Sequence, residues 1–398
     1  MYYLAEDVFI VRGTAKDCIY DLNKGKLYHV SHDVSWLIDE LSVNSEIWEK
    51  HKDTVDYLIS QNLIEFKETG KNKDITSLKS ANRIKIAWIE VCTFCNLKCI
   101  HCYNDSSPMC HTFMNYSDFQ FVCDSLKNYG IKRIQIIGGE PFCNSHICEM
   151  LEYANRCFDS VEIFTNATLL SPSIIDQLKK LGTKVAISLY SNLEEHHEIV
   201  TKTKGSYSNT VSSISQLKKA GVPYRISNIL MDGIELGKNN SELFHMKKHR
   251  SVIKMAGRGN LGLLNEELLK IKMITKESFS EKFNRNLIIE RINGHQCFSQ
   301  KVYISAKLDV FPCVMERRLC HGNLRNKSLD EVLNPTIMSL NKDCIEECKC
   351  CEFRYACFDC RPDNIGGNIQ TKPYYCTYSV KEGTWKSPDI IVSNVLSI

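Results

Sequence analysis

Runs of apolar residues alternate with amphipathic stretches along the middle of the chain. Between the apolar runs, apolar residues recur at helical spacing, as in residues 116–130, 174–182 and 210–221. Strands that alternate with helices predict an α/β fold with a parallel sheet, and near-continuous apolar strands predict that helices cover it. Functional side chains of such a sheet are expected at the carboxyl ends of its strands. The six apolar runs are residues 84–91, 132–139, 160–166, 184–190, 224–231 and 251–257.

Residues 1 to about 70 follow a different pattern and predict a separate small domain. Strand-like stretches at 8–13 and 17–30, the second with a turn at the sequence NKG, precede helical spacing at 31–41 and 54–66. The polar segment 67–83 is the expected linker to the rest of the chain. An accessory domain that packs on the remainder of the chain is one interpretation of this pattern.

The composition is that of an ordinary globular protein with two or three domains. The chain has 398 residues, of which 43% are hydrophobic and 24% charged, and its formal net charge is +3. No apolar run approaches the roughly 20 residues that a membrane-spanning helix needs. The N-terminus lacks the features of an export signal. These observations predict a soluble, cytoplasmic protein, and they give no argument for a membrane or a nucleic acid as its partner.

The twenty cysteines are unevenly distributed. Cys18 alone precedes residue 92, nine cysteines lie between Cys92 and Cys157, and ten lie between Cys297 and Cys376. In a small secreted domain this density would indicate disulfides. In a reducing cytoplasm and a chain of this length, metal or cluster ligation is the better interpretation.

Cys95, Cys99 and Cys102 form the pattern C-x-x-x-C-x-x-C directly after the first predicted strand. Three thiolates on one short loop are able to hold three irons of a four-iron cluster and leave the fourth iron open to another ligand. Zinc is the alternative, because zinc binds four ligands tetrahedrally and Cys92 or Cys110 would supply the fourth. The spacing alone leaves both interpretations open.

The sequence CNLKCIHCY resembles the signature of the radical S-adenosylmethionine (SAM) enzymes, and the sequence GGEP follows the second predicted strand, where that family carries the same four residues. The resemblance implies a partial (β/α)6 barrel in which Cys95, Cys99 and Cys102 hold a catalytic 4Fe-4S cluster whose open iron binds SAM. It also implies that one electron cleaves SAM to a 5′-deoxyadenosyl radical, which abstracts hydrogen from the substrate. The positions implied to contact SAM are Gly138, Gly139, Glu140, Pro141, Asn166, Ser188, Gly257 and Gly259.

The cysteines after residue 290 resemble the SPASM extension of radical SAM peptide and sulfatase maturases, which holds two auxiliary 4Fe-4S clusters. The resemblance assigns Cys348, Cys351, Cys357 and Cys376 to the outer cluster, and Cys297, Cys313 and Cys360 to the inner cluster. Two features depart from the SPASM pattern: Leu308 stands where a Gly is usual, and the last cysteine pair is spaced C-x-x-C. A zinc ribbon is the alternative. The spare cysteines are Cys320, Cys344 and Cys350.

The inner set has only three pattern-matched thiolates. An iron without a protein ligand needs an outside donor, and a substrate cysteine thiolate is well suited. The alternative is that Cys320 completes this cluster. We also expect His196 and His197 on an exposed helix, at the surface or next to a site's ligands and not as ligands themselves. Arg317 and Arg318 are expected to pair with surface acids in preference to binding phosphate.

The N-terminal sequence IYDLNKG and its order of elements resemble the winged-helix leader-recognition domain of enzymes that modify ribosomally made peptides. The expected organisation is therefore a leader-recognition-like domain (1–75), a radical SAM barrel (82–285) and a SPASM domain (290–398). The implied function is hydrogen abstraction that crosslinks a precursor peptide, which has a leader and a core, with a thioether favoured over a carbon-carbon bond. The implied partners are this peptide and an electron donor such as flavodoxin or ferredoxin.

Two alternatives to this function stay open. One is formylglycine formation of the sulfatase-maturase type, against which the N-terminal domain argues. The other is a non-catalytic iron-sulfur or zinc partner subunit, against which the complete CNLKCIHCY and GGEP sequences argue.

Overall fold

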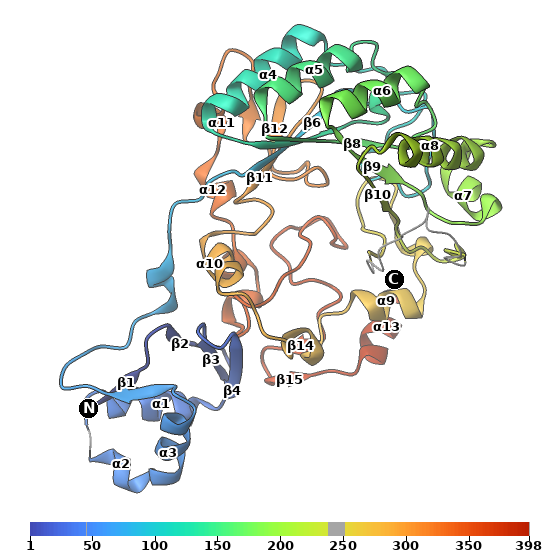
Figure 1. The fold of residues 1–398 in the computed structure, drawn as a ribbon. Coiled ribbons are helices and arrows are strands. Elements are labelled where there is room, and N and C mark those ends of the chain that lie inside the picture. Colours follow the sequence, from blue (N-terminus) through green and yellow to red (C-terminus); the bar gives the residue numbers. More distant parts are fainter. Residues whose placement is uncertain (45, 238–250, 398) are drawn as a thin grey trace. The chain divides into compact units, whose positions relative to one another are not determined.

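The computed structural model describes residues 1–44, 46–237 and 251–397 of the chain (Figure 1). The chain divides into two compact units. The terminal unit comprises Met1–Asn82, Met273–Gln296 and Ser339–Ile398, and the sheet unit comprises Arg83–Lys272 and Cys297–Met338. No helix in the described ranges is both long and apolar enough to cross a membrane.

The sheet unit is built on an eight-stranded sheet with the order β10-β9-β8-β7-β6-β11-β12-β13. All neighbouring pairs from β10 to β11 are parallel, and β12 and β13 add antiparallel strands at one edge. This confirms the predicted α/β fold with a largely parallel sheet. The strands are β6 (Ile86–Glu90), β7 (Arg133–Ile137), β8 (Ser160–Thr165), β9 (Lys184–Ser188), β10 (Tyr224–Ser227), β11 (Lys301–Ile304), β12 (Asp309–Phe311) and β13 (Gly322–Asn323).

Helices α4, α5, α6 and α8 lie along one face of this sheet (Figure 1). Alternate strand residues such as Ala87 and Ile89 point to this face and share a buried core with Phe119 and Val122 of α4. The helices are α4 (Tyr116–Tyr129), α5 (Ile147–Cys157), α6 (Pro172–Leu181), α7 (Glu194–Thr201), α8 (Ser206–Ala220), α9 (Glu266–Lys272), α11 (Leu329–Val332) and α12 (Pro335–Met338), with short 3-10 turns η2 (Pro141–Cys143) and η3 (Leu261–Leu263).

The opposite face of the sheet carries a row of polar side chains that crosses the strands. Trp88 of β6 donates to Gln135 of β7, which donates to Glu162 of β8 at 2.8 Å. Arg225 of β10 reaches over β9 to Glu162 at 2.7 Å. Two positions further along the strands, on the same face, lie the carboxyl ends of the strands. There Ile137, Phe164, Ser188 and Ser227 line a pocket.

The sixth predicted strand, residues 251–257, is not a strand in the described part of the chain. Its one sheet-like contact is a single parallel bridge between Leu230 and Val252, and residues 238–250 lie outside the described residues. The sixth parallel strand is instead β11, which pairs with β6 on the other side of the sheet.

The terminal unit contains the N-terminal strands and helices that the sequence predicts. Strands β2, β3 and β4 form an antiparallel sheet, and β1 pairs with β5. The elements are β1 (Tyr2–Leu4), β2 (Val8–Val11), β3 (Asp17–Asp21), β4 (Lys26–Val30), α1 (His32–Leu41), α2 (Ile47–Lys50), α3 (Lys52–Ser60), β5 (Ile64–Phe66), α10 (Arg285–Asn293), β14 (Tyr378–Ser379), β15 (Thr384–Trp385), α13 (Pro388–Leu396) and the 3-10 turns η1 (Ile75–Leu78), η4 (Lys276–Phe279), η5 (Lys342–Cys344) and η6 (Cys348–Cys350).

One buried core joins the N-terminal sheet to the C-terminal part of this unit. Phe9 and Tyr20 of the sheet pack in the same cluster as Phe353 and Tyr378. The Tyr20 hydroxyl donates to the carbonyl of Glu352 at 2.9 Å, and the buried Glu352 carboxylate lies 2.6 Å from Nε2 of His29 on β4. The first 82 residues are therefore part of the packing around the C-terminal cysteines.

Candidate functional site

The thiol loop, residues 91–110, follows β6 at the carboxyl end of the sheet and contains Cys95, Cys99 and Cys102. It has little regular structure, so contacts from other segments hold its backbone. The N–H groups of Lys98 and Ile100 donate to the carbonyls of Thr201 and Val200, at 3.1 and 2.9 Å. The end of α7 thus fixes the middle of the loop.

The loop and the strand ends enclose a pocket of about 230 Å³. The structure brings together here the predicted residues Cys95, Cys99, Cys102, Gly138, Gly139, Asn166 and Ser188 from separate strands and loops. Because these residues come from four segments spread over almost a hundred positions, their convergence is a property of the fold. The other lining residues are Leu97, His101, Tyr103, Asn104, Ser106, Ile137, Phe164, Thr165, Tyr190, Ser227 and Ile229.

The GGEP segment is bound to the start of the thiol loop. The backbone N–H groups of Gly139 and Glu140 donate to the carbonyls of Cys92 and Phe94, each at 2.8 Å. A Cβ atom on Gly139 would lie 2.1 Å from the Phe94 carbonyl oxygen, which no side chain allows. Glycine is therefore required here by the close approach of two protein segments.

Glu140 and Pro141 do not line the pocket in the described structure. The Glu140 carboxylate is fully buried and accepts hydrogen bonds from the Thr165 hydroxyl (2.8 Å), the Asn166 N–H (2.7 Å) and the Phe142 N–H (3.1 Å). Burial raises the pKa of Glu140 to about 7, although these hydrogen bonds lower it. Its place is between two strand ends, where it fixes the Asn166 segment.

Asn166 and Ser188 both reach the pocket. The Asn166 amide donates to the Asn96 side chain at 2.9 Å and lies 3.9 Å from the Cys95 sulfur. The Tyr190 hydroxyl, two residues after Ser188, hydrogen-bonds with Ser188 and with Cys99. Side chains at the ends of β8 and β9 therefore contact the thiols directly.

Two histidines that sequence reasoning did not place in the site lie against Tyr190. The His101 ring is 4.6 Å from the Tyr190 ring in an edge-on contact, and the His197 ring stacks on Tyr190 at 5.6 Å. Burial, followed by the charge of Arg258, lowers the pKa of His101 to about 4, so its ring is neutral at pH 7. The expectation that His197 is exposed is wrong, since it is 1% exposed. Its spacing with the apolar Val200 on one helix face is the signal that would have indicated burial.

The three thiols have the chemical character of cluster ligands. Burial raises the pKa of Cys95 well above its usual range and that of Cys99 to about 12, so without a positive partner both would stay neutral. Bound iron supplies that positive charge and displaces the protons. Within the described residues, no three His, Cys, Asp or Glu side chains converge on one ion. A four-iron cluster has a different requirement, because each thiolate binds a separate iron. The pocket residues therefore fit such a cluster.

Gly257 and Gly259 do not line the pocket. Gly257 has a φ of +57°, and a Cβ there would lie 2.3 Å from the Cys102 carbonyl oxygen. The segment 254–260 therefore packs against the back of the thiol loop.

A second group of thiols lies in the terminal unit. Cys348, Cys351, Cys357 and Cys376 line one small cavity of about 20 Å³ together with Lys342 and Lys372. The pKa values of Cys348 and Cys357 are raised, because burial outweighs the opposing effect of the nearby positive charge on Lys342. The four predicted ligands of the outer cluster thus lie together beside cationic groups. Cys360 is outside this cavity lining, and its backbone N–H donates to the Tyr375 hydroxyl at 3.0 Å.

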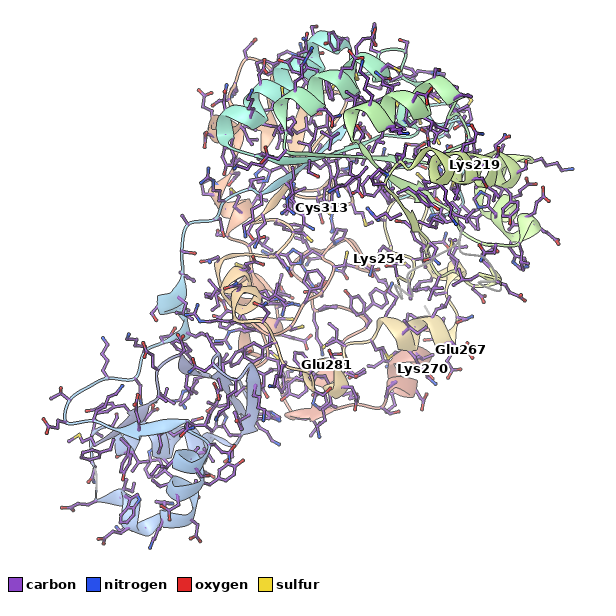
Figure 2. All side chains as sticks on the ribbon, in the orientation of Figure 1. Lys219, Lys254, Glu267, Lys270, Glu281 and Cys313 are labelled. Atoms are coloured by element: carbon purple, nitrogen blue, oxygen red, sulfur yellow. The ribbon has the colours of Figure 1, made fainter. Side chains whose placement is uncertain are left out.

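The other predicted inner-cluster residues belong to the sheet unit. Cys313, labelled in Figure 2, follows β12, is 8% exposed and interacts electrostatically with Cys297. Cys360 belongs to the terminal unit. The spare Cys320, Cys344 and Cys350 are all exposed.

Arg318 forms the predicted ion pair, but its partner is a buried acid and not a surface acid. This partner is Glu316, at 2.5 Å. Arg317 instead lies over the Tyr303 ring, 3.7 Å from its centroid, and donates to the Asn104 side chain at 2.6 Å. For Arg317 the prediction of an ion pair with a surface acid is wrong, because aromatic rings and an amide hold its guanidinium.

Known proteins are similar to this chain in sequence. The antilisterial bacteriocin subtilosin biosynthesis protein AlbA of Bacillus subtilis is 30% identical over 200 residues, which are 48% of this chain and 44% of AlbA. The AdoMet-dependent heme synthase of Methanosarcina barkeri is 24% identical over 340 residues, which are 74% of this chain and 96% of that protein. The chain thus spans less than half the length of AlbA.

Solved structures share the fold. Streptococcus suis SuiB bound to S-adenosylmethionine superimposes with a TM-score of 0.56 at 13% identity, covering 96% of this chain and 100% of SuiB. SuiB bound to its precursor peptide SuiA gives a TM-score of 0.54 at 14% identity, with the same coverage. At these identities the similarity establishes the fold alone.

The family model of the Radical SAM superfamily matches residues 89–238. This range begins within β6 and includes the three thiols, the GGEP segment and the ends of β8 and β9. The match agrees with the resemblance first seen in CNLKCIHCY and GGEP: over residues 89–238 the chain is similar to the radical SAM superfamily.

Proposed function

We propose that the chain is a radical SAM enzyme that modifies a ribosomally made precursor peptide. The observation that carries this proposal is the pocket in which Cys95, Cys99 and Cys102 meet the strand ends of the radical SAM domain. A 4Fe-4S cluster with bound SAM would supply a radical able to abstract hydrogen from a carbon of the peptide. The chain's own residues hold this chemistry in place and shield it from solvent.

Each part of the pocket has a proposed role. Cys95, Cys99 and Cys102 would hold the cluster. Gly138, Gly139, Asn166 and Ser188 would contact SAM, because they line the same pocket. Glu140, with its three hydrogen bonds, would position the Asn166 segment without touching SAM. Gly257 and Gly259 would shape the thiol loop from behind.

The cysteines after residue 290 would hold two auxiliary 4Fe-4S clusters. Cys348, Cys351, Cys357 and Cys376 would bind the outer cluster, which their shared cavity supports. Cys297, Cys313 and Cys360 would bind the inner cluster, with an iron left open for a cysteine thiolate of the substrate. This arrangement favours a thioether product over a carbon-carbon crosslink. An electron donor such as flavodoxin or ferredoxin would supply the reducing electron.

The N-terminal sheet is the proposed docking site for the leader of the peptide. Strand β4 is an edge strand that pairs with β3 on one side, and no backbone hydrogen bond reaches its other side within the described residues. An edge of this kind accepts an extended peptide as an added strand. The exposed Tyr57 of α3 lies close enough to Tyr28 of β4 to act on it electrostatically. The names of two similar proteins support a peptide substrate: AlbA acts in subtilosin biosynthesis, and SuiB binds the precursor SuiA.

Anaerobic co-expression with a cysteine-containing precursor tests this function. Mass spectrometry of the peptide is expected to show the loss of two hydrogen atoms, with the thiol no longer open to alkylation. The C95A/C99A/C102A variant is the matched control and is expected to leave the peptide unchanged, because the cluster loses its ligands. Unmodified peptide from a wild-type enzyme that cleaves SAM would contradict the peptide substrate.

A further inference from the structure

Arg258 is bound to the back of the thiol loop by a set of contacts that neither the family match nor the sequence motifs assign. Its Nε donates to the Cys99 carbonyl at 2.8 Å, and its Nη2 donates to the Ser106 carbonyl at 2.7 Å. Its own backbone N–H donates to the Cys102 carbonyl at 3.0 Å. Its Nη1 pairs with the Asp105 carboxylate at 2.6 Å. Arg258 thus contacts the loop at the carbonyls of Cys99 and Cys102 and at two residues that follow Cys102.

The glycines on either side allow this approach. A Cβ on Gly257 would collide with the Cys102 carbonyl, at 2.3 Å, and one on Gly259 would lie 1.9 Å from the Lys254 carbonyl. Only a chain without side chains at these two positions is able to turn so tightly against the loop. The two glycines of the sequence G-R-G therefore allow a tight turn that brings Arg258 against the thiol loop.

The fork of the Arg258 side chain suits this position. Its nitrogen atoms diverge in one plane and reach carbonyl groups from both ends of the Cys99–Ser106 stretch, which a lysine ammonium is unable to do from one point. The other support of the loop, from Val200 and Thr201, binds Lys98 and Ile100. The stretch that carries Cys99 and Cys102 is thus held both by the end of α7 and by Arg258.

The charge of Arg258 also acts on the site. The arginine side chain is 22% exposed, whereas its ionic partner Asp105 is 72% exposed and is therefore screened by water. The guanidinium lies against the thiol loop itself, since its Nε donates to the Cys99 carbonyl. A cation this close to the thiolates also favours the more negative, reduced state of a cluster that they bind.

We propose that Arg258 is a positioning residue that holds the thiol loop in its ligating shape and raises the reduction potential of the cluster bound there. The inference rests on the cluster part of the proposed function and is independent of the peptide. Its test therefore reads the cluster, so that failure of the peptide chemistry and failure of this inference give different results.

The test compares the R258Q and R258K variants of the full chain with wild type after anaerobic iron-sulfur reconstitution. The K98Q variant is the matched control, since Lys98 is an exposed cation of the same loop whose bond to Thr201 comes from its backbone. The measurements are iron per chain, circular dichroism, the midpoint potential, and the change in the electron paramagnetic resonance signal when SAM is added. The residues proposed to contact SAM line the same pocket as Cys95, Cys99 and Cys102, so this SAM-dependent change is expected from the cluster held there and separates it from the auxiliary clusters.

We expect R258Q to have a more negative midpoint potential and a weaker SAM-dependent signal. R258K, which keeps the charge but not the fork, is expected to recover part of the potential, and K98Q is expected to match wild type. Loss of iron from R258Q with an unchanged circular dichroism spectrum also supports the inference. A wild-type potential and signal in R258Q would overturn it, as would an equal shift in K98Q. If R258Q fails to fold, a wild-type SAM-dependent signal in R258K would overturn the role of the fork.

Discussion

Leu308 has a backbone conformation that glycine usually supplies. Its φ is +69°, in the left-handed region, within the turn that joins β11 to β12. The left-handed conformation costs an L-residue about 1–2 kcal/mol. The side chain is 1% exposed, and burying a leucine contributes about 1.5–3 kcal/mol. Burial therefore offsets the strain, which is why leucine is tolerated where the SPASM pattern has glycine.

Replacing Leu308 tests this balance between strain and burial. In L308G the strain is removed but the buried side chain is lost, and large-to-small core changes cost about 2–5 kcal/mol. We expect L308G to be less stable than wild type by about 1–3 kcal/mol. L308A keeps the strain and loses the side chain, so it should be less stable than L308G. Urea unfolding followed by circular dichroism measures both, and an L308G variant as stable as wild type would show that burial is not what holds this turn.

The five strands β6 to β10 were predictable from the sequence because each is a short, nearly continuous apolar run followed by turn residues. Their ends placed Gly138, Asn166 and Ser188 at one edge of the sheet, as observed. The segment 251–257 has a similar apolar start, but its glycines pack against the thiol loop. In the sequence, an apolar run that forms a strand is not distinguishable from one that leads into a glycine-rich segment packed on another loop.

Burial of polar side chains was less predictable than the strands. His197 looks exposed in the sequence EEHHEIV, yet it stacks on Tyr190, which follows β9. Arg317 lies over Tyr303 of β11, which is distant in the sequence. Each side chain depends on a neighbour more than six positions away, and hydrophobic periodicity carries no information about such pairs. The four contacts of Arg258 were missed for the same reason.

The junction of β3 and α1 is expected to make the terminal unit sensitive to pH. His32 of α1 lies 3.1 Å from the Asp17 carboxylate of β3, which also accepts from Arg12 and the Gly13 N–H. The hydrogen bond to Asp17 raises the pKa of His32. Burial alone would raise the pKa of Asp17, but hydrogen bonds from His32 and Gly13 outweigh it, so this pKa is lowered.

The two shifts define the direction of the effect. A raised His32 pKa stabilises the fold below the unfolded value of about 6.5, and this contribution is lost as pH rises through the folded value. The lowered pKa of Asp17 stabilises the fold above about pH 4, and this stabilisation is lost as pH falls. We expect the urea midpoint of the wild type to decrease from pH 6 to pH 8, and H32A to lose this decrease. A variant with the same pH dependence as wild type would assign the effect to another group.

At the scale of the whole molecule, the terminal unit joins segments from both ends of the sequence. The Thr14 N–H donates to the Cys350 carbonyl at 3.0 Å, and Arg354 donates to the Arg12 carbonyl at 2.7 Å. Cys351 and Cys376 border the same core that contains Phe9 and Tyr20. The cysteines proposed for the outer cluster therefore depend on the N-terminal sheet for their packing.

This shared core determines what a truncation removes. Deleting residues 1–70 takes away five buried side chains of the core, and at about 1.5–3 kcal/mol for each large apolar side chain the loss is comparable to the whole stability of a typical domain. We expect the truncated protein to lose the iron bound by its C-terminal cysteines, so truncation does not isolate leader binding. The five side chains are Phe9, Val11, Cys18, Tyr20 and Leu22.

A surface variant separates leader binding from folding. Tyr57 of α3 is 55% exposed, near the free edge of β4, and is outside the buried core. In Y57K a bulky aromatic contact is replaced by a mobile cation. We therefore expect the affinity for the precursor to fall by about tenfold, which corresponds to the loss of one contact of roughly 1.4 kcal/mol. Fluorescence anisotropy of a labelled leader measures this affinity. Iron content and SAM cleavage without peptide should stay at the wild-type level, because the substitution leaves both sets of thiols untouched.

F66K, which alters an exposed aromatic residue on the separate β1-β5 pair, should bind the leader normally. Equal affinity in Y57K and wild type would remove the edge of β4 beside Tyr57 as the docking site, and the N-terminal sheet would then serve the packing of the C-terminal cysteines.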